Sequence, residues 1–173
     1  MPKEALIVVD MLVDFIDEKG ALYCGPTAGR IVPFIKRKIE EARQAGALVI
    51  YVCDSHKPND KEFEMFPRHS VAGTPGAQVI PELKPERGDI VVRKRRFSAF
   101  YGTRLEDILK KNRVKHAVVV GVCTSICVMD TVGDLRNRDY PVTVYKKGVA
   151  DFDQKFHRFA LQRMEKTYGA EVV

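Results

Sequence analysis

Apolar, mostly β-branched runs alternate with amphipathic stretches along the whole chain. The runs lack polar–apolar alternation, and continuous apolar runs are typical of strands covered on both faces. Gly46 follows the first amphipathic stretch and Pro33 lies near its start, which are the stop and start signals of a helix. The pattern predicts strands at 5–9, 47–53, 89–92, 116–122 and 141–145, a short strand in the closing AEVV, and helices at about 31–45, 103–113, 125–138 and 153–168.

This alternation predicts a single α/β domain over residues 1–173. Right-handed crossovers would give a six-stranded, mostly parallel, Rossmann-like sheet with helices on both faces, a three-layer α/β/α arrangement. A chain of this length buries about 70% of its unfolded surface, and the sequence contains no repeat or linker. Ligands bind beyond the carboxyl ends of the strands in such sheets, so polar residues at those ends are the first site candidates.

The charge balance adds little to this picture. The chain has 29 basic and 23 acidic residues, a net charge of +6, and one dense basic cluster, RKRR at 93–96. Such a mild excess is typical of a solvated surface rather than a nucleic-acid site. No segment is apolar for long enough to cross a membrane, and the N-terminus lacks the pattern of a signal peptide. We therefore expect a cytoplasmic protein that binds neither nucleic acid nor membrane.

The four cysteines are Cys24, Cys53, Cys123 and Cys127. They show no C-x-x-C spacing and no secretion signal accompanies them, so they do not indicate a disulfide framework. Geometry disfavours a disulfide between Cys123 and Cys127, which lie four residues apart across a bend. We interpret Cys24 and Cys53 as structural residues.

The segment GVCTSICV (121–128) joins the fourth predicted strand to a helix. The strand is expected to stop near Val122, and Thr124 or Ser125 can be the N-cap of the helix. Cys127 then falls in the first helical turn, where free N–H groups and the helix dipole favour a thiolate. Cys123 lies in the connection, where its backbone N–H matters more than its sulfur. Cys127 is therefore the candidate nucleophile.

Two other predicted strands end at charged residues. Asp10 follows the first strand, and Lys94 follows the third within the basic cluster. A buried carboxylate is costly unless it is paired or used, although Asp10 alone could be a cap or turn residue. Lys94 could be part of a solvated edge that prevents sheet aggregation, or a cation that stabilises a nearby thiolate or carboxylate.

The second predicted strand ends in CDSH, and a loop leads from there to His69. Asp54 and His56 are two residues apart, so both side chains can point the same way on an extended chain. Carboxylates and imidazoles suit zinc, manganese or iron. Asp54, His56 and His69 are candidate metal ligands, with Glu62 or Glu64 as a fourth, although an isolated D-x-H is more often a surface loop.

Taken together, these motifs make the chain resemble the nicotinamidase branch of the isochorismatase-like cysteine hydrolase superfamily. The segments that carry the resemblance are VVDMLVDF (8–15), CDSH (53–56), FPRHSVAGTPGA (66–77), KRRFSAFYGT (94–103) and GVCTSICV (121–128), in the family's order. The resemblance implies the family's α/β hydrolase fold, a homo-oligomer, and a catalytic triad at Asp10, Lys94 and Cys127. It also implies an oxyanion hole at the backbone N–H groups of Cys123 and Cys127, after a cis peptide bond between Val122 and Cys123.

For the metal, the resemblance implies a divalent ion, zinc with manganese or iron as alternatives. Its ligands fall on Asp54, His56 and His69, with Glu62 as the best match for the variable fourth. Phe15 and Phe66 are candidate walls for a substrate ring, or ordinary core residues. In FPRHS (66–70), Phe66 and Ser70 stand where nicotinamidases often have Trp and Cys, and both differences bear on the substrate.

The implied activity is hydrolysis of nicotinamide to nicotinate and ammonia, a step of NAD salvage, through a thioester on Cys127. The same scaffold could act on another small amide or ureido compound, or on isochorismate. The intact set of Asp10, Lys94 and Cys127 argues against isochorismate. Outside this class, the alternatives are a non-catalytic binding protein that uses RKRR, and a thiol redox protein that uses Cys123 and Cys127.

Overall fold

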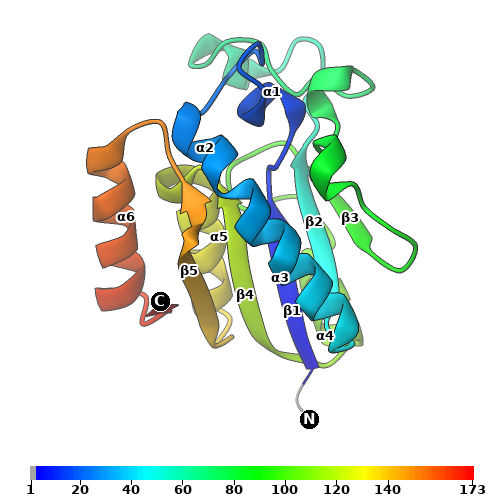
Figure 1. Ribbon diagram of the computed structural model, residues 1–173, viewed down its shortest axis with the longest axis vertical. Helices are drawn as coiled ribbons and strands as arrows, with labels where there is room; N and C mark the ends of the chain where they lie inside the picture. The colour runs from blue at the N-terminus through cyan, green and yellow to red at the C-terminus, as the bar shows by residue number, and fades with distance from the viewer. Residues whose placement is uncertain (1–2) are drawn as a thin grey trace.

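The computed structural model describes residues 3–173. Six strands form one sheet in the order β3-β2-β1-β4-β5-β6, and every pairing between neighbouring strands is parallel. Figure 1 shows this sheet between layers of helices. The predicted three-layer α/β fold with six strands is therefore confirmed. The strands are β1 (Lys3–Val9), β2 (Leu48–Asp54), β3 (Ile90–Lys94), β4 (Val114–Val122), β5 (Val142–Ala150) and β6 (Glu171–Val172).

Helices cover both faces of the sheet. The short α1 and α2 lead into α3 on one face, and α4, α5 and α6 pack on the other side (Figure 1). Pro33 lies in the first turn of α3, as its fixed φ allows. The helices are α1 (Val13–Ile16), α2 (Pro26–Arg30), α3 (Val32–Gln44), α4 (Leu105–Lys111), α5 (Met129–Arg136) and α6 (Gln154–Lys166).

The sheet separates two apolar cores. Ile7 and Val9 of β1 face the core under α4, α5 and α6, whereas Leu6 and Val8 face the core under α3. All four side chains are at most 2% exposed. Burying each such aliphatic side chain stabilises the fold by about 1.5–3 kcal/mol. Because both faces are covered, the strand sequences are apolar at successive positions, which explains the missing alternation.

The largest difference from the predicted elements follows β4. The helix expected over 125–138 begins as a single π-helical turn, η4 (Thr124–Val128), and continues as α5. β5 runs on to Ala150, five residues beyond the predicted end, because a register shift against β4 lets pairing resume at Val149. The sequence pattern also missed α1, α2 and three short 3-10 turns, η1 (Lys61–Glu64), η2 (Pro75–Ala77) and η3 (Pro81–Leu83).

Among the described residues, no helix is long and apolar enough to span a membrane.

Candidate active site and metal centre

The carboxyl ends of four neighbouring strands bring their charged and thiol side chains to one edge of the sheet. Asp10 directly follows β1, Asp54 ends β2, Lys94 ends β3, and Cys127 lies in η4 after β4. Asp54 and Lys94 are register partners across β2 and β3. The backbone N–H of Asp10 donates to the carbonyl of Val52 over 2.8 Å, which continues the sheet by one bond. All four side chains are buried.

Asp10, Lys94 and Cys127, called the triad below, are in direct contact. The Nζ of Lys94 lies 2.9 Å from Oδ2 of Asp10 and 3.4 Å from Sγ of Cys127. It also donates to Oδ1 of Asp54 over 2.5 Å. The ion pair of Lys94 with Asp10 lacks hydrogen-bond geometry, so Oδ2 of Asp10 has no hydrogen-bond partner within residues 3–173. This carboxylate oxygen is therefore available to accept a proton.

The protonation states follow from burial and from the shared lysine. Burial and the charge of Asp54 raise the pKa of Asp10 to about 6, against the lowering effect of Lys94. Burial raises the pKa of Cys127 well above its ordinary value, although Lys94 opposes this. The resting pair is therefore a thiol beside a carboxylate. Desolvation at this buried position therefore opposes the preference for a thiolate that the first helical turn provides.

The bend that carries Cys127 depends on backbone features. The peptide bond between Val122 and Cys123 is cis, as the resemblance implied. Gly121 has φ of 122°, and a Cβ there would lie 2.0 Å from the carbonyl oxygen of Val9. Only glycine therefore fits where β4 passes β1 just before the bend.

Neither Thr124 nor Ser125 caps the helix with its own side chain, so that expectation was wrong. The buried carboxylate of Asp151, just beyond β5, instead accepts the backbone N–H of Ser125 over 2.8 Å. The hydroxyl of Thr124 pairs with Nδ1 of His157 over 2.8 Å. Asp151 directly follows an apolar strand, a signal that was missed because β5 is longer than its sequence pattern indicated.

Asp54, His56, Glu62 and His69 form a second buried cluster, called the ligand group below. One ligand atom from each lies within 4.8 Å of all the others. Nε2 of His56 is 3.6 Å from Oδ2 of Asp54, and Nε2 of His69 is 3.8 Å from Oε1 of Glu62. Glu64 is exposed and stays outside the cluster, so Glu62 is the fourth residue that the fold brings in.

The ligand group fits a divalent cation. Nε2 of His56 and Oε2 of Glu62 are buried without a hydrogen-bond partner in the described part of the chain. The other ring nitrogen of each histidine has a partner: Nδ1 of His56 lies 3.3 Å from the carboxylate of Asp60, and Nδ1 of His69 lies 2.7 Å from the carbonyl of Pro67. Such outer contacts orient the ring nitrogens of metal-binding histidines. Two carboxylates and two imidazoles suit zinc, manganese or iron.

Two side chains of the basic cluster RKRR point toward these two groups, and the other two point into the solvent. Lys94 points into the triad, and Arg93 and Arg95 are exposed. Arg96 donates to Asp60 over 2.8 Å, and the same carboxylate of Asp60 accepts the N–H of Glu62. Asp60 therefore connects Arg96 to the ligand group. The sequence offered only a weak signal for it, an acidic residue four positions after His56.

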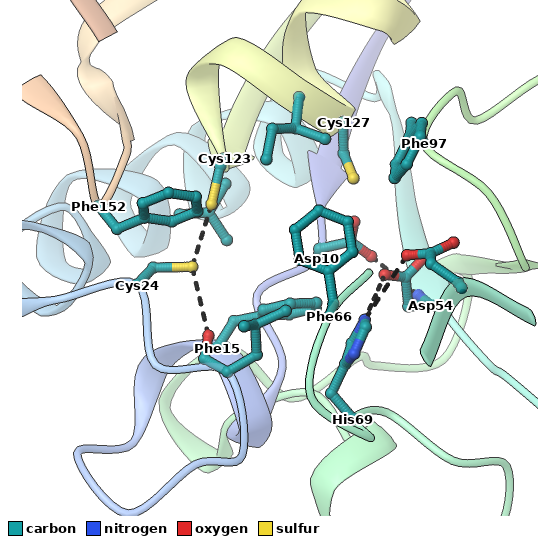
Figure 2. Close-up of a pocket in the computed structure, with 14 residues that line it drawn as sticks. Asp10, Phe15, Cys24, Asp54, Phe66, His69, Phe97, Cys123, Cys127 and Phe152 are labelled. Atoms are coloured by element: carbon teal, nitrogen blue, oxygen red, sulfur yellow. Dashed lines mark hydrogen bonds and ion pairs between the residues drawn. The ribbon is translucent and has the colours of Figure 1, made fainter. Parts of the chain in front are cut away.

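A pocket opens between the triad and the ligand group. The space within it, including the part that is open to solvent, is about 380 Å³. Figure 2 shows the ring of Phe66 over Asp10, with Cys127 and Phe97 on one side and His69 and Asp54 on another. Phe15 and Phe66 line the pocket as expected, and the sequence pattern missed Phe97 and Phe152. The rings of Phe15 and His69 are 5.4 Å apart between centroids.

Comparison with known proteins places the chain among hydrolases. The family model described as the Isochorismatase domain matches residues 4–173. An uncharacterized isochorismatase family protein of Bacillus subtilis (strain 168), PncA, is 34% identical over 180 residues, 98% of each chain. A probable inactive nicotinamidase of Arabidopsis thaliana is 38% identical over 164 residues, 88% of this chain and 83% of its own.

Solved structures agree with this placement. The nicotinamidase/pyrazinamidase PncA of Bacillus subtilis is 32% identical, with a TM-score of 0.94 over 99% of both chains. A pyrazinamidase of Pyrococcus horikoshii in complex with zinc is also 32% identical, with a TM-score of 0.93 over 99% of both chains. An N-carbamoylsarcosine amidase of Thermoplasma acidophilum is 38% identical, with a TM-score of 0.89 over 98% of this chain and 95% of its own.

Proposed function

Because the chain belongs to the isochorismatase family of hydrolases, we propose that it is a metal-dependent cysteine amidohydrolase that converts nicotinamide to nicotinate and ammonia. The observation that carries the proposal is the contact of Lys94 with both Asp10 and Cys127 beside an apolar pocket. A buried thiol, a carboxylate and a lysine at such distances are the parts of an activated nucleophile.

In the first step, Asp10 takes the proton of Cys127. Its Oδ2 has no hydrogen-bond partner within residues 3–173, and the carboxylate and the sulfur lie within 4.8 Å of each other. With a pKa of about 6, Asp10 is mainly ionised at neutral pH and strong enough to act as a base. The ammonium of Lys94, 3.4 Å from the sulfur, stabilises the thiolate as it forms.

The thiolate then attacks the carboxamide carbon. The backbone N–H groups of Cys123 and Cys127 hold the oxyanion, at about 3 kcal/mol for each donor in comparable sites. Asp10 returns its proton to the departing ammonia, which leaves a thioester on Cys127. Water, deprotonated by Asp10, hydrolyses the thioester and restores the thiol.

The ligand group would hold a divalent ion, zinc with manganese or iron as alternatives, which supplies a Lewis-acid position for the pyridine nitrogen and for bound water. Zinc is supported by its presence in the Pyrococcus horikoshii pyrazinamidase. Asp54 belongs to the ligand group and accepts a hydrogen bond from Lys94, so it links this group to the triad.

The pocket favours an uncharged aromatic amide. It is lined by Phe15, Phe66, Phe97 and Phe152, and none of its lining residues is a lysine or arginine. Against the phenylalanine rings, a substrate with its own carboxylate, such as N-carbamoylsarcosine, would lose hydration without gaining a lysine or arginine partner. A planar ring instead gains contact with the phenylalanine faces.

Ammonia release from nicotinamide tests this proposal directly. The zinc-loaded protein is incubated with nicotinamide, pyrazinamide and N-carbamoylsarcosine, and ammonia is measured enzymatically. We expect release from the two ring amides and none from Cys127→Ala, whereas Cys53→Ala, which removes a thiol outside the pocket, stays active. Absence of release from every amide would refute the amidase, and a preference for N-carbamoylsarcosine would refute the nicotinamide assignment.

A further inference from the structure

Two thiols that the proposed chemistry does not use lie against each other in the pocket wall. The sulfurs of Cys24 and Cys123 are 3.1 Å apart, although 99 positions separate the residues in the chain. Figure 2 shows them facing each other beside Phe152, on the side of the pocket away from Asp54 and His69. Cys24 lies in the loop between α1 and α2, and Cys123 lies in the bend after β4.

The pocket connects this thiol pair to the solvent. Both cysteines are buried, at 0% and 7% exposed, yet both line the same cavity as Cys127. A macromolecule or a bulky thiol reagent cannot reach them without opening the fold. A small neutral oxidant can enter by the route that the substrate would use.

We propose that Cys24 and Cys123 are the site of a reversible disulfide that hydrogen peroxide forms and that a thiol reductant breaks. One sulfur attacks the O–O bond of peroxide, which gives a sulfenic acid and one water. The second thiol then attacks that sulfur and releases a second water. Two thiols and one peroxide thus become one disulfide and two waters, and the peroxide takes up both electrons.

Closing the bond requires a small movement. A disulfide has its sulfurs about 2.05 Å apart, so the pair must approach by about 1 Å. On one side, the backbone N–H of Cys24 donates to the carbonyl of Phe15 over 2.9 Å, so a shift of Cys24 also moves the pocket wall. On the other side, Cys123 carries a backbone N–H of the proposed oxyanion hole. Displacing such a donor by about 1 Å reduces turnover on the order of a hundredfold.

The disulfide is therefore expected to switch the enzyme off. This loss of activity rests on the proposed function, whereas the disulfide itself does not. The hydrogen bond with Cys24 and burial raise the pKa of Cys123 well above its ordinary value. Thiolate is the reactive form, so oxidation at neutral pH should be slow and should accelerate as the pH rises.

Peptide mapping of Cys127→Ala tests the site without interference from the nucleophile. The reduced variant is treated with hydrogen peroxide, the remaining thiols are alkylated, and the digest is analysed by mass spectrometry. We expect one cross-linked peptide that joins Cys24 to Cys123 and disappears after dithiothreitol. The melting temperature should rise by roughly 5–15 °C, because the bond closes a long loop. Separate oxidation of the two sulfurs without a cross-link would overturn the proposal.

The activity measurement uses the protein with Cys127 in place. Peroxide should lower nicotinamide turnover on the order of a hundredfold, and dithiothreitol should restore it. Peroxide can also oxidise Cys127, so the control is Cys24→Ala, compared before and after the same treatment. An equal loss in this variant would refute the switch. If the cross-link forms but no form of the protein hydrolyses nicotinamide, the disulfide site stands and the proposed function fails.

Discussion

The triad and the ligand group occupy the same edge of the sheet but are built in different ways. Each member of the triad lies at or just beyond the end of a strand. In the ligand group, only Asp54 belongs to a strand, and its other members come from the loop and turn between β2 and β3. Strand ends are held by the sheet itself, whereas the loop is held by individual hydrogen bonds, such as those of Asp60 with His56 and Arg96 and that of Ser70 with Asp14.

The two groups also differ in charge. In the triad, Lys94 faces the carboxylates of Asp10 and Asp54, which raise its pKa well above the ordinary value although burial alone would lower it. The lysine is therefore a permanent cation within the protein. In the ligand group, Asp54 shares the same lysine, whereas Nε2 of His56 and Oε2 of Glu62 have no hydrogen-bond partner within residues 3–173 and are of the kind that coordinate a metal. We therefore expect the ligand group, and not the triad, to bind the proposed ion.

Lys94→Met should disrupt the triad and the ligand group together, because Lys94 contacts Asp10 of the triad and Asp54 of the ligand group. Removing it leaves two buried carboxylates without their cation, which costs about 3–5 kcal/mol of unfolding free energy. We expect loss of turnover together with a large drop in the urea midpoint. Lys147→Met, at an exposed lysine, is the control and should change neither quantity. A stable, active Lys94→Met enzyme would show that the shared lysine is dispensable.

Asp10→Asn should affect the triad alone. The amide keeps the shape of the side chain but cannot take the proton of Cys127, so kcat should fall by about 10²–10⁴. Metal analysis after dialysis should give the same zinc content as the parent protein. If zinc is lost together with activity, Asp10 serves the ligand group as well and the two groups are not separable.

His56→Ala should affect the ligand group alone. Loss of one of four ligands lowers metal affinity, so zinc content after dialysis should fall to a small fraction of that in the parent. Alkylation of Cys127 by iodoacetamide, a readout of the triad, should keep its rate. His116→Ala is the matched control, since His116 lies near the start of β4 at the opposite end of the sheet. Unchanged metal content in His56→Ala would exclude His56 as a ligand.

Asp60→Ala should have the smallest effect of the four. Asp60 holds Nδ1 of His56 and the N–H of Glu62, and loss of such outer contacts weakens metal affinity by about 10–100-fold. Excess zinc should therefore restore turnover, which it would not do for Asp10→Asn. Asp107→Ala, at an exposed aspartate, serves as the control. A zinc affinity equal to that of the parent would show that the loop orients His56 without Asp60.

Much of the triad could be predicted from the sequence because its geometry follows from strand order. The end of a continuous apolar run can be located in the sequence, and the carboxyl ends of adjacent parallel strands lie side by side at one edge of the sheet. Asp10, Lys94 and Cys127 were found in this way, together with the family motifs. Their roles remain proposals that the variants above test.

The contacts that support these residues could not be predicted, because each depends on chain segments far apart in sequence. Asp151 caps the bend from a strand 26 residues away, and Phe152 reaches the pocket from the same segment. The close pair of Cys24 and Cys123 is the extreme case, since neither position shows a motif for it.

The apolar pattern alone was enough to specify a parallel sheet covered on both faces, because burial on two sides demands apolar residues at successive positions. It was also enough to indicate which strand ends carry a thiol, a carboxylate and a lysine. Tertiary structure placed Glu62 inside the ligand group and left Glu64 exposed. It alone decided that burial raises the pKa of Cys127 well above its ordinary value and that Cys123 faces Cys24 rather than Cys127. These outcomes depend on desolvation and on loop packing, which arise only when distant segments exclude water from a common interior.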